Sequence, residues 1–154
     1  MKRQRIYIDT SVIGGCFDVE FAEWSNGLMN DFRNGTFQPL LSEVVAAEID
    51  EAPENVQLIY AELRSLDAEI LAVDADSLEL AEEYQARKIL KPDFYDDGLH
   101  IALATVAESD LLVSWNFKHI VRFDKIRLFN AVNIEFGYKS LEIFSPREVT
   151  TYGH

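Results

Sequence analysis

Short apolar runs alternate along the chain with longer stretches in which apolar residues recur every three or four positions. The short runs are rich in β-branched and aromatic residues and end at polar or turn-forming residues, which is typical of buried strands. The longer stretches have the spacing of a helix with one buried face. This pattern predicts strands at 6–8, 37–41, 70–73, 111–114 and 141–144, helices at 21–33, 43–50, 55–66, 75–89, 95–107 and 123–136, and short helical turns after 116 and 145. Ser42 is expected to cap the second helix, and Asp74 or Asp76 the fourth.

The alternation of strands and helices favours a parallel sheet between helical layers. We therefore expect one α/β domain over residues 1–154, a three-layer α/β/α sandwich with a central, mostly parallel sheet. No apolar run approaches the roughly 18 residues of a membrane span, so no membrane association is expected. The basic N-terminus leads into a short strand rather than a signal-peptide core. The single cysteine, Cys16, has no partner for an internal disulfide, which favours a reducing cytoplasm.

Negative charge is concentrated in one segment of the chain. The net charge is −13, and residues 43–83 contain thirteen acids and one base, Arg64, which account for −12 of it. The overall charge therefore argues against general electrostatic binding of nucleic acid. Local basic runs could still contact phosphates, although an ordinary solvated surface is the alternative. The densest is Lys118, His119, Arg122, Lys125 and Arg127, and a second is Lys2, Arg3 and Arg5.

Polar side chains follow the predicted strands and begin one buried helix. Asp9 and Asn116 come directly after strands, and Asp97 lies in the first turn of an almost wholly apolar helix. Ligands of parallel α/β sheets bind beyond the carboxyl ends of the strands, where these side chains are expected to meet. Glu48 lies beside small residues on another helix, where an unpartnered carboxylate would be costly. Gathered carboxylates repel one another unless a cation neutralises them, and their oxygens suit Mg²⁺ or Mn²⁺.

Each candidate also has a purely structural interpretation. Asp9 could cap the helix that follows it, and Asn116 could close a turn. Asp96 and Asp97 could favour the positive end of their helix, a contribution of up to about 1 kcal/mol. The remaining residues of interest are more often structural. His100 is expected to be a hydrogen-bonded packing histidine, His119 a surface residue and Trp115 a packing residue rather than a platform for a base.

Four stretches of the sequence resemble the motifs of the PIN-domain nucleases, particularly the toxin ribonucleases of toxin–antitoxin pairs. They are Tyr7-Ile8-Asp9-Thr10-Ser11, the segment 41–48 that ends at Glu48, the segment 97–104 that begins at Asp97, and Leu112-Val113-Ser114-Trp115-Asn116. The resemblance implies a parallel sheet flanked by helices and divalent-metal-dependent cleavage of RNA. It makes Asp9, Glu48 and Asp97 the metal-binding acids, with Ser11 and Thr10 supporting the first. It also implies two partners, a second copy of the chain and an antitoxin.

One position departs from this resemblance. Many relatives have a fourth acid where this chain has Asn116, which can accept a hydrogen bond but adds no charge. Asp96 is the nearest substitute as a ligand, and Asp124 a more distant one. Successive helical residues differ in direction by about 100°, so Asp96 and Asp97 cannot both point inward. Lys118, Arg122 and Lys125 are the expected contacts to the RNA backbone.

Two other functional classes compete with a nuclease. Without a fourth acid, the domain could be a protein-interaction or regulatory module whose acidic segment faces a basic partner. A phosphatase or phospho-acceptor domain would also have an acid after its first strand. Dehalogenase-type phosphatases need a second acid two residues later, where this chain has Ser11, and receiver domains need an acid pair where it has only Asp9. A phosphatase or phospho-acceptor domain is therefore disfavoured.

Overall fold

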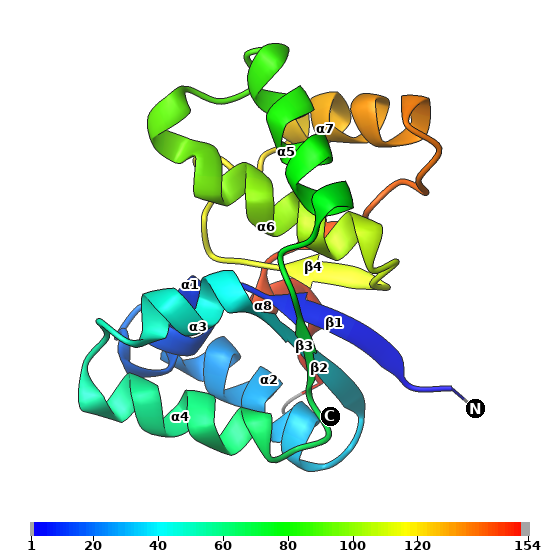
Figure 1. Cartoon of the computed structure of the whole chain (residues 1–154). Helices are drawn as coiled ribbons and strands as arrows, with labels where there is room; N and C mark the ends of the chain where they lie inside the picture. Colours follow the sequence, from blue (N-terminus) through cyan, green and yellow to red (C-terminus); the bar gives the residue numbers. More distant parts are fainter. Residues whose placement is uncertain (1, 152–154) are drawn as a thin grey trace.

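A computed structural model describes residues 2–151 and contains a five-stranded sheet in the order β3-β2-β1-β4-β5. Every neighbouring pair of strands is parallel, which confirms the expected three-layer α/β/α architecture. The first strand lies at the centre of the sheet because β2 pairs with one of its sides and β4 with the other (Figure 1). The strands are β1 (Gln4–Ile8), β2 (Phe37–Ser42), β3 (Glu69–Leu71), β4 (Leu111–Val113) and β5 (Ile143–Phe144).

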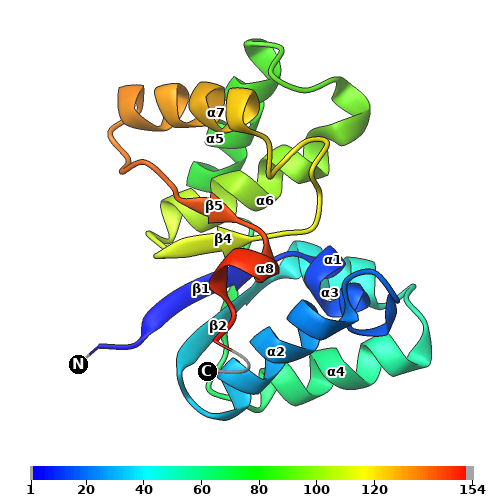
Figure 2. The same ribbon diagram turned by 180° about the vertical axis from the view of Figure 1, so that it is seen from behind.

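Helices cover both faces of this sheet. The α-helices are α1 (Thr10–Gly14), α2 (Ala22–Arg33), α3 (Glu43–Ile49), α4 (Glu54–Arg64), α5 (Ala75–Ala86), α6 (Tyr95–Val106), α7 (Phe123–Glu135) and α8 (Pro146–Val149), and η1 (Gly15–Phe17) and η2 (Pro92–Phe94) are 3₁₀ turns. Both ribbon views show α5, α6 and α7 on one side of the sheet and α2 and α4 on the other (Figures 1 and 2). No helix within residues 2–151 is long and apolar enough to span a membrane.

The central strand β1 determines where the residues after β1, β2 and β4 lie. Its last residues, from Ile6 to Ile8, are fully buried, as expected for a strand covered on both faces. Tyr7 pairs with Leu40 of β2, and Ile8 pairs with Val113 of β4. The residues that follow β1, β2 and β4 therefore lie at one edge of the sheet, as the strand-end argument requires.

Three local features complete the sequence prediction. The chain forms α1 and η1 directly after β1, where only the capping interpretation of Asp9 had implied a helix. The short helical turn predicted after Asn116 is a hydrogen-bonded turn over residues 117–120 that does not continue into a helix, with the amide of Ile120 donating to the Asn116 carbonyl. Asp74 caps α5 in a reciprocal capping box, which resolves the choice between Asp74 and Asp76.

Gly15 permits the unpredicted turn to pack closely against the loop after β4. A Cβ atom at this position would lie 2.5 Å from Ser25 Oγ and 2.7 Å from Trp115 Nε1. The Trp115 indole donates to Ser25 Oγ at 2.8 Å and is buried. Trp115 is therefore a packing residue, as expected, and it joins the loop after β4 to α2.

Candidate functional site

Asp9 lies at the carboxyl end of β1 and is only 5% exposed. Its carboxylate accepts hydrogen bonds of 2.6 Å from the hydroxyls of Ser11 and Ser114. Asp9 occupies the N-cap position of α1, but its side chain makes no capping hydrogen bond. The carboxylate is therefore bound by the two serines rather than by an amide of α1, although Asp9 stands at the N-cap position that the capping interpretation expected.

The two serines that hold Asp9 also join the loops after β1 and β4. Ser11 Oγ accepts from the amide of Trp115, and Ser114 Oγ accepts from the amide of Asn116, both at 2.9 Å. Burial raises the pKa of Asp9, while the charge of His100 and the serine hydrogen bonds act in the opposite direction. The result is a rigidly held carboxyl group at the base of the site.

Glu48 extends from α3 and shares its Oε1 between two donors. Thr10 Oγ1 donates to it at 2.9 Å, and His100 Nε2 lies 3.0 Å away. Burial alone would raise the pKa of Glu48, but the hydrogen bond and charge of His100 outweigh burial and lower it. Thr10 thus supports the second acid, whereas Ser11 supports the first.

His100 is buried in α6 and continues this network into the core. Its Nδ1 lies 2.6 Å from the hydroxyl of Tyr7, and that hydroxyl lies 2.8 Å from Ser42 Oγ. When the neutral ring carries its proton on Nε2, it donates to Glu48 and accepts from Tyr7. Ser42 in turn accepts from the amide of Val45 and caps α3, the helix that carries Glu48. A single chain of hydrogen bonds therefore fixes the second acid.

Asp97 begins α6 and is paired with a second histidine. His119 Nδ1 lies 2.9 Å from Asp97 Oδ2, and the Asp97 side chain is 24% exposed. Asn116 Oδ1 accepts from the backbone amides of Lys118 and His119 at 3.2 and 2.9 Å. The side-chain oxygen of Asn116 therefore closes the turn that presents His119 to Asp97, in agreement with the structural interpretation of this residue.

The three predicted acids all influence the charge of one buried side chain, His100. Burial lowers the pKa of His100, but the hydrogen bond to Glu48 and the charges of Asp9, Glu48 and Asp97 raise it above its ordinary value. All three carboxylates therefore lie within electrostatic reach of this imidazole. Asp96 is exposed on α6, and exposed Asp124 bonds to Arg122 instead.

The donor types at the site suit a divalent cation, but the side chains bind one another. Carboxylate oxygens are the ligands that Mg²⁺ and Mn²⁺ prefer. Within residues 2–151, no three His, Cys, Asp or Glu side chains are grouped as a metal site. Glu48 Oε2 and Asp97 Oδ1 make no hydrogen bond within the same residues, so each retains one oxygen for a further partner. In its donor types, the set of Asp9, Glu48 and Asp97 fits such a cation.

Both histidines contact predicted acids, which the sequence analysis did not predict. His100 was expected to pack, and His119 to lie on the surface, yet each contacts a predicted acid. One signal was available, because His100 follows Asp97 by three residues and so lies on the same face of α6. No local signal marked Tyr7 or Ser114, whose roles depend on strand pairing.

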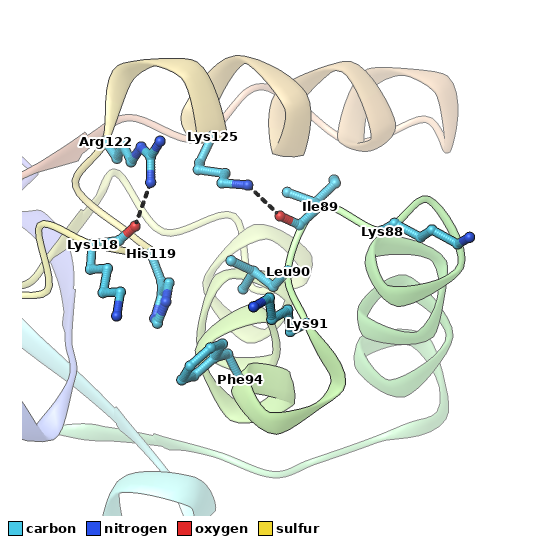
Figure 3. A pocket seen from close by; sticks show the side chains of 9 residues that line it. All are labelled: Lys88, Ile89, Leu90, Lys91, Phe94, Lys118, His119, Arg122 and Lys125. Carbon is cyan, nitrogen blue, oxygen red and sulfur yellow. Dashed lines mark hydrogen bonds between the residues drawn. The ribbon is translucent and has the colours of Figure 1, made fainter.

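His119 also lines a cavity of about 390 Å³ (Figure 3). We call it the basic pocket. All three predicted RNA contacts, Lys118, Arg122 and Lys125, line it. Arg127 does not, and its guanidinium lies over the ring of Phe123 instead. The predicted basic strip is therefore divided between two surfaces, of which one borders the acids.

No protein-family model and no curated protein matches the sequence. Among solved structures, the chain is similar to one in the crystal structure of VapBC2 from Rickettsia felis bound to a DNA fragment from their promoter, with a TM-score of 0.59 and 16% sequence identity. The similarity covers 92% of this chain and 98% of that chain. At this level of identity the comparison concerns the fold. The chain therefore shares its fold, a three-layer α/β/α sandwich with a parallel sheet, with that chain.

Proposed function

We propose that this protein is a divalent-metal-dependent endoribonuclease and the toxin of a toxin–antitoxin pair. The observation that supports this most directly is that Glu48 contacts both Thr10, which follows Asp9, and His100, which lies one helical turn after Asp97. Asp9, Glu48 and Asp97 therefore lie near one another at the carboxyl edge of the sheet and all act electrostatically on His100, although burial and mutual repulsion both oppose it. Such an arrangement is typical of functional sites.

Asp9, Glu48 and Asp97 are the residues that would hold Mg²⁺ or Mn²⁺, and exposed Asp96 is the candidate for a further ligand. A bound cation of this kind lowers the pKa of a water ligand and stabilises charge on a phosphate. The chain's own part is positioning. Ser11 and Ser114 orient the carboxylate of Asp9. His100 and His119 position Glu48 and Asp97.

The missing fourth acid favours one cation over two. Asn116 uses its side-chain oxygen to close a turn, and it contributes no charge to offset a second dication. We therefore expect activity with a single cation per site. Hydrolysis by this route leaves a 5′-phosphate and a 3′-hydroxyl.

The proposed partners are an antitoxin protein and a second copy of the chain. The structurally similar VapBC2 is described as a complex bound to a promoter DNA fragment, which supports an antitoxin as a partner here. The cytoplasm is the proposed location, and buried, unpaired Cys16 agrees with it.

The test is cleavage of a mixed RNA pool with Mn²⁺, with Mg²⁺ and with a chelator. The wild-type protein should produce fragments only with a metal, and Asp97→Ala and Asp9→Asn should produce none. Ser65→Ala, an exposed substitution away from the site, is the matched control and should retain activity. Identical products from the wild type and Asp97→Ala, with or without the chelator, would refute the nuclease proposal.

A binding module without turnover is the second candidate. It is favoured by the histidine contacts of Glu48 and Asp97, which occupy one oxygen of each acid, together with the amide at Asn116. In that case no metal would yield RNA cleavage, and Asp9→Asn would leave partner binding unchanged.

A further inference from the structure

The basic pocket collects positive charge on a strongly acidic protein. Five of the 14 lysines and arginines in the chain line it, although the net charge is −13. None of the residues lining it carries a carboxylate. The lining is Lys88, Ile89, Leu90, Lys91, Phe94, Lys118, His119, Arg122 and Lys125.

Most of this charge is not neutralised by the protein. Among the described residues, no lysine of the pocket forms an ion pair, and only Arg122 does, with exposed Asp124. The ammonium of Lys125 donates to the Ile89 carbonyl at 2.6 Å, and Lys88 points away from the other cations (Figure 3). Lys91 and Lys118 remain as the cations without an ion pair, and Arg122 keeps Nη2 for a further acceptor, since its Nε binds Asp124 and its Nη1 the Lys118 carbonyl. Like charges held together in this way favour a negatively charged ligand.

One wall of the pocket is aromatic. The rings of Phe94 and His119 lie with their centroids 3.9 Å apart and their planes inclined by 36°. The ammonium of Lys118 lies 6.0 Å from the centroid of the Phe94 ring. Phe94 is partly buried and lines the pocket. Aromatic faces beside cations are the usual means of binding single-stranded nucleic acid, through stacking on bases and contacts to phosphates.

His119 connects this pocket to the acids. The same side chain that stacks on Phe94 contacts Asp97 at 2.9 Å. A strand held in the pocket would therefore continue directly to the carboxylates. The volume, about 390 Å³, is near the lower end of the roughly 300–1,000 Å³ range of ligand pockets, which suits one nucleotide rather than a duplex.

We propose that the basic pocket binds one unpaired nucleotide of the RNA substrate. Its base stacks on Phe94, and its phosphate is held by Lys91, Lys118 and Arg122. The proposal rests on the proposed nuclease function for the identity of the ligand and specifies that function further. A base can enter the pocket only if it is unstacked, so the preferred substrate is single-stranded RNA.

The experiment measures the anisotropy of a fluorescein-labelled, short single-stranded RNA with a chelator present, so that binding is observed without cleavage. Phe94→Ala should weaken binding at least about fivefold, whereas Phe94→Leu, which keeps the apolar volume, separates lost stacking from lost packing. Lys118→Gln should reduce the slope of log affinity against log salt by about 0.7, the value for one phosphate contact on a single strand. Lys139→Gln is the matched control, because Lys139 is exposed and lines a different cavity.

Expected results are weaker binding for Phe94→Ala, Phe94→Leu and Lys118→Gln, and no change for Lys139→Gln. A duplex of the same sequence should bind more weakly than the single strand. Equal salt slopes for Lys118→Gln and Lys139→Gln would overturn the proposal. A duplex that binds as tightly as the single strand would also overturn it. So would the absence of any RNA binding. Binding in the pocket without metal-dependent cleavage would refute the nuclease function alone, and cleavage insensitive to Lys118→Gln and Phe94→Ala would refute the pocket alone.

Discussion

Replacing Ser11 with alanine tests the framework that holds Asp9. The Ser11 hydroxyl donates to Asp9 Oδ1 at 2.6 Å and accepts from the amide of Trp115 at 2.9 Å. Ser11→Ala removes a hydrogen bond to a carboxylate, worth about 1.5–3 kcal/mol, and deprives a backbone amide of its acceptor, at about 1–3 kcal/mol. Ser11 is only half-buried, so water replaces part of this loss. We expect the free energy of unfolding to fall by about 2–4 kcal/mol.

The assay is equilibrium unfolding in urea, with Ser65→Ala as the matched control. The Ser65 hydroxyl donates to the Glu62 carbonyl at an exposed helix end, so its loss should change stability by less than about 0.5 kcal/mol. For a domain of this size, the Ser11 variant should also melt about 4–16 °C lower. A Ser11→Ala protein as stable as Ser65→Ala would show that this hydroxyl does not hold Asp9, and the explanation of the site would be wrong.

Three further substitutions test the fold. Gly15→Ala should destabilise the protein by about 1–3 kcal/mol in urea unfolding, because the new Cβ would lie 2.5 Å from Ser25 Oγ and 2.7 Å from Trp115 Nε1; wild-type stability would show that this contact relaxes freely. Asp74→Ala removes a helix cap and should lower stability by about 1 kcal/mol at neutral pH. The backbone and side-chain hydrogen bonds of Ser77 lower the pKa of Asp74, so this contribution is present above the unfolded value of about 3.9 and is lost as the pH falls through the folded value. Unfolding curves of both proteins should therefore converge in acid, and a constant difference would contradict this reasoning. Tyr7→Phe removes a hydroxyl that bridges two buried side chains and should lower the free energy of unfolding by about 1–3 kcal/mol.

The sheet was predictable because its signals are local. Each strand is a short apolar run, and the buried residues Ile6 to Ile8 of β1 are those expected of a strand covered on both faces. The order of the strands was not predicted, because it depends on pairing between distant segments. The predictions of Asp9, Asn116 and Asp97 as neighbours follow from the same rule, since parallel strands bring their carboxyl ends to one edge. Helix α1, by contrast, has no clear local signal in the sequence. Its sequence, Thr10–Gly14, is short and includes β-branched residues and glycine, so the tertiary contact at Gly15 decides its conformation.

The histidine contacts could not be predicted because they join residues distant in sequence. Glu48 and His100 are 52 residues apart, and Asp97 and His119 are 22 apart. Whether such pairs meet depends on how α3 and the loop after β4 pack against α6, which no local pattern specifies. The stacking of Phe94 on His119 depends on the same packing. Sequence patterns therefore predicted the acids of the proposed site but not the side chains that contact them.

Asn116 shows how the departure from the family pattern affects the site. Its backbone amide donates to Ser114 Oγ, which holds Asp9, and its side-chain oxygen closes the turn that presents His119 to Asp97. An aspartate could accept the same backbone hydrogen bonds, so the amide leaves this framework intact and changes only the charge. A fourth carboxylate at this edge would add repulsion to the three that already act on His100. The asparagine therefore preserves the geometry of the edge without adding a negative charge to it.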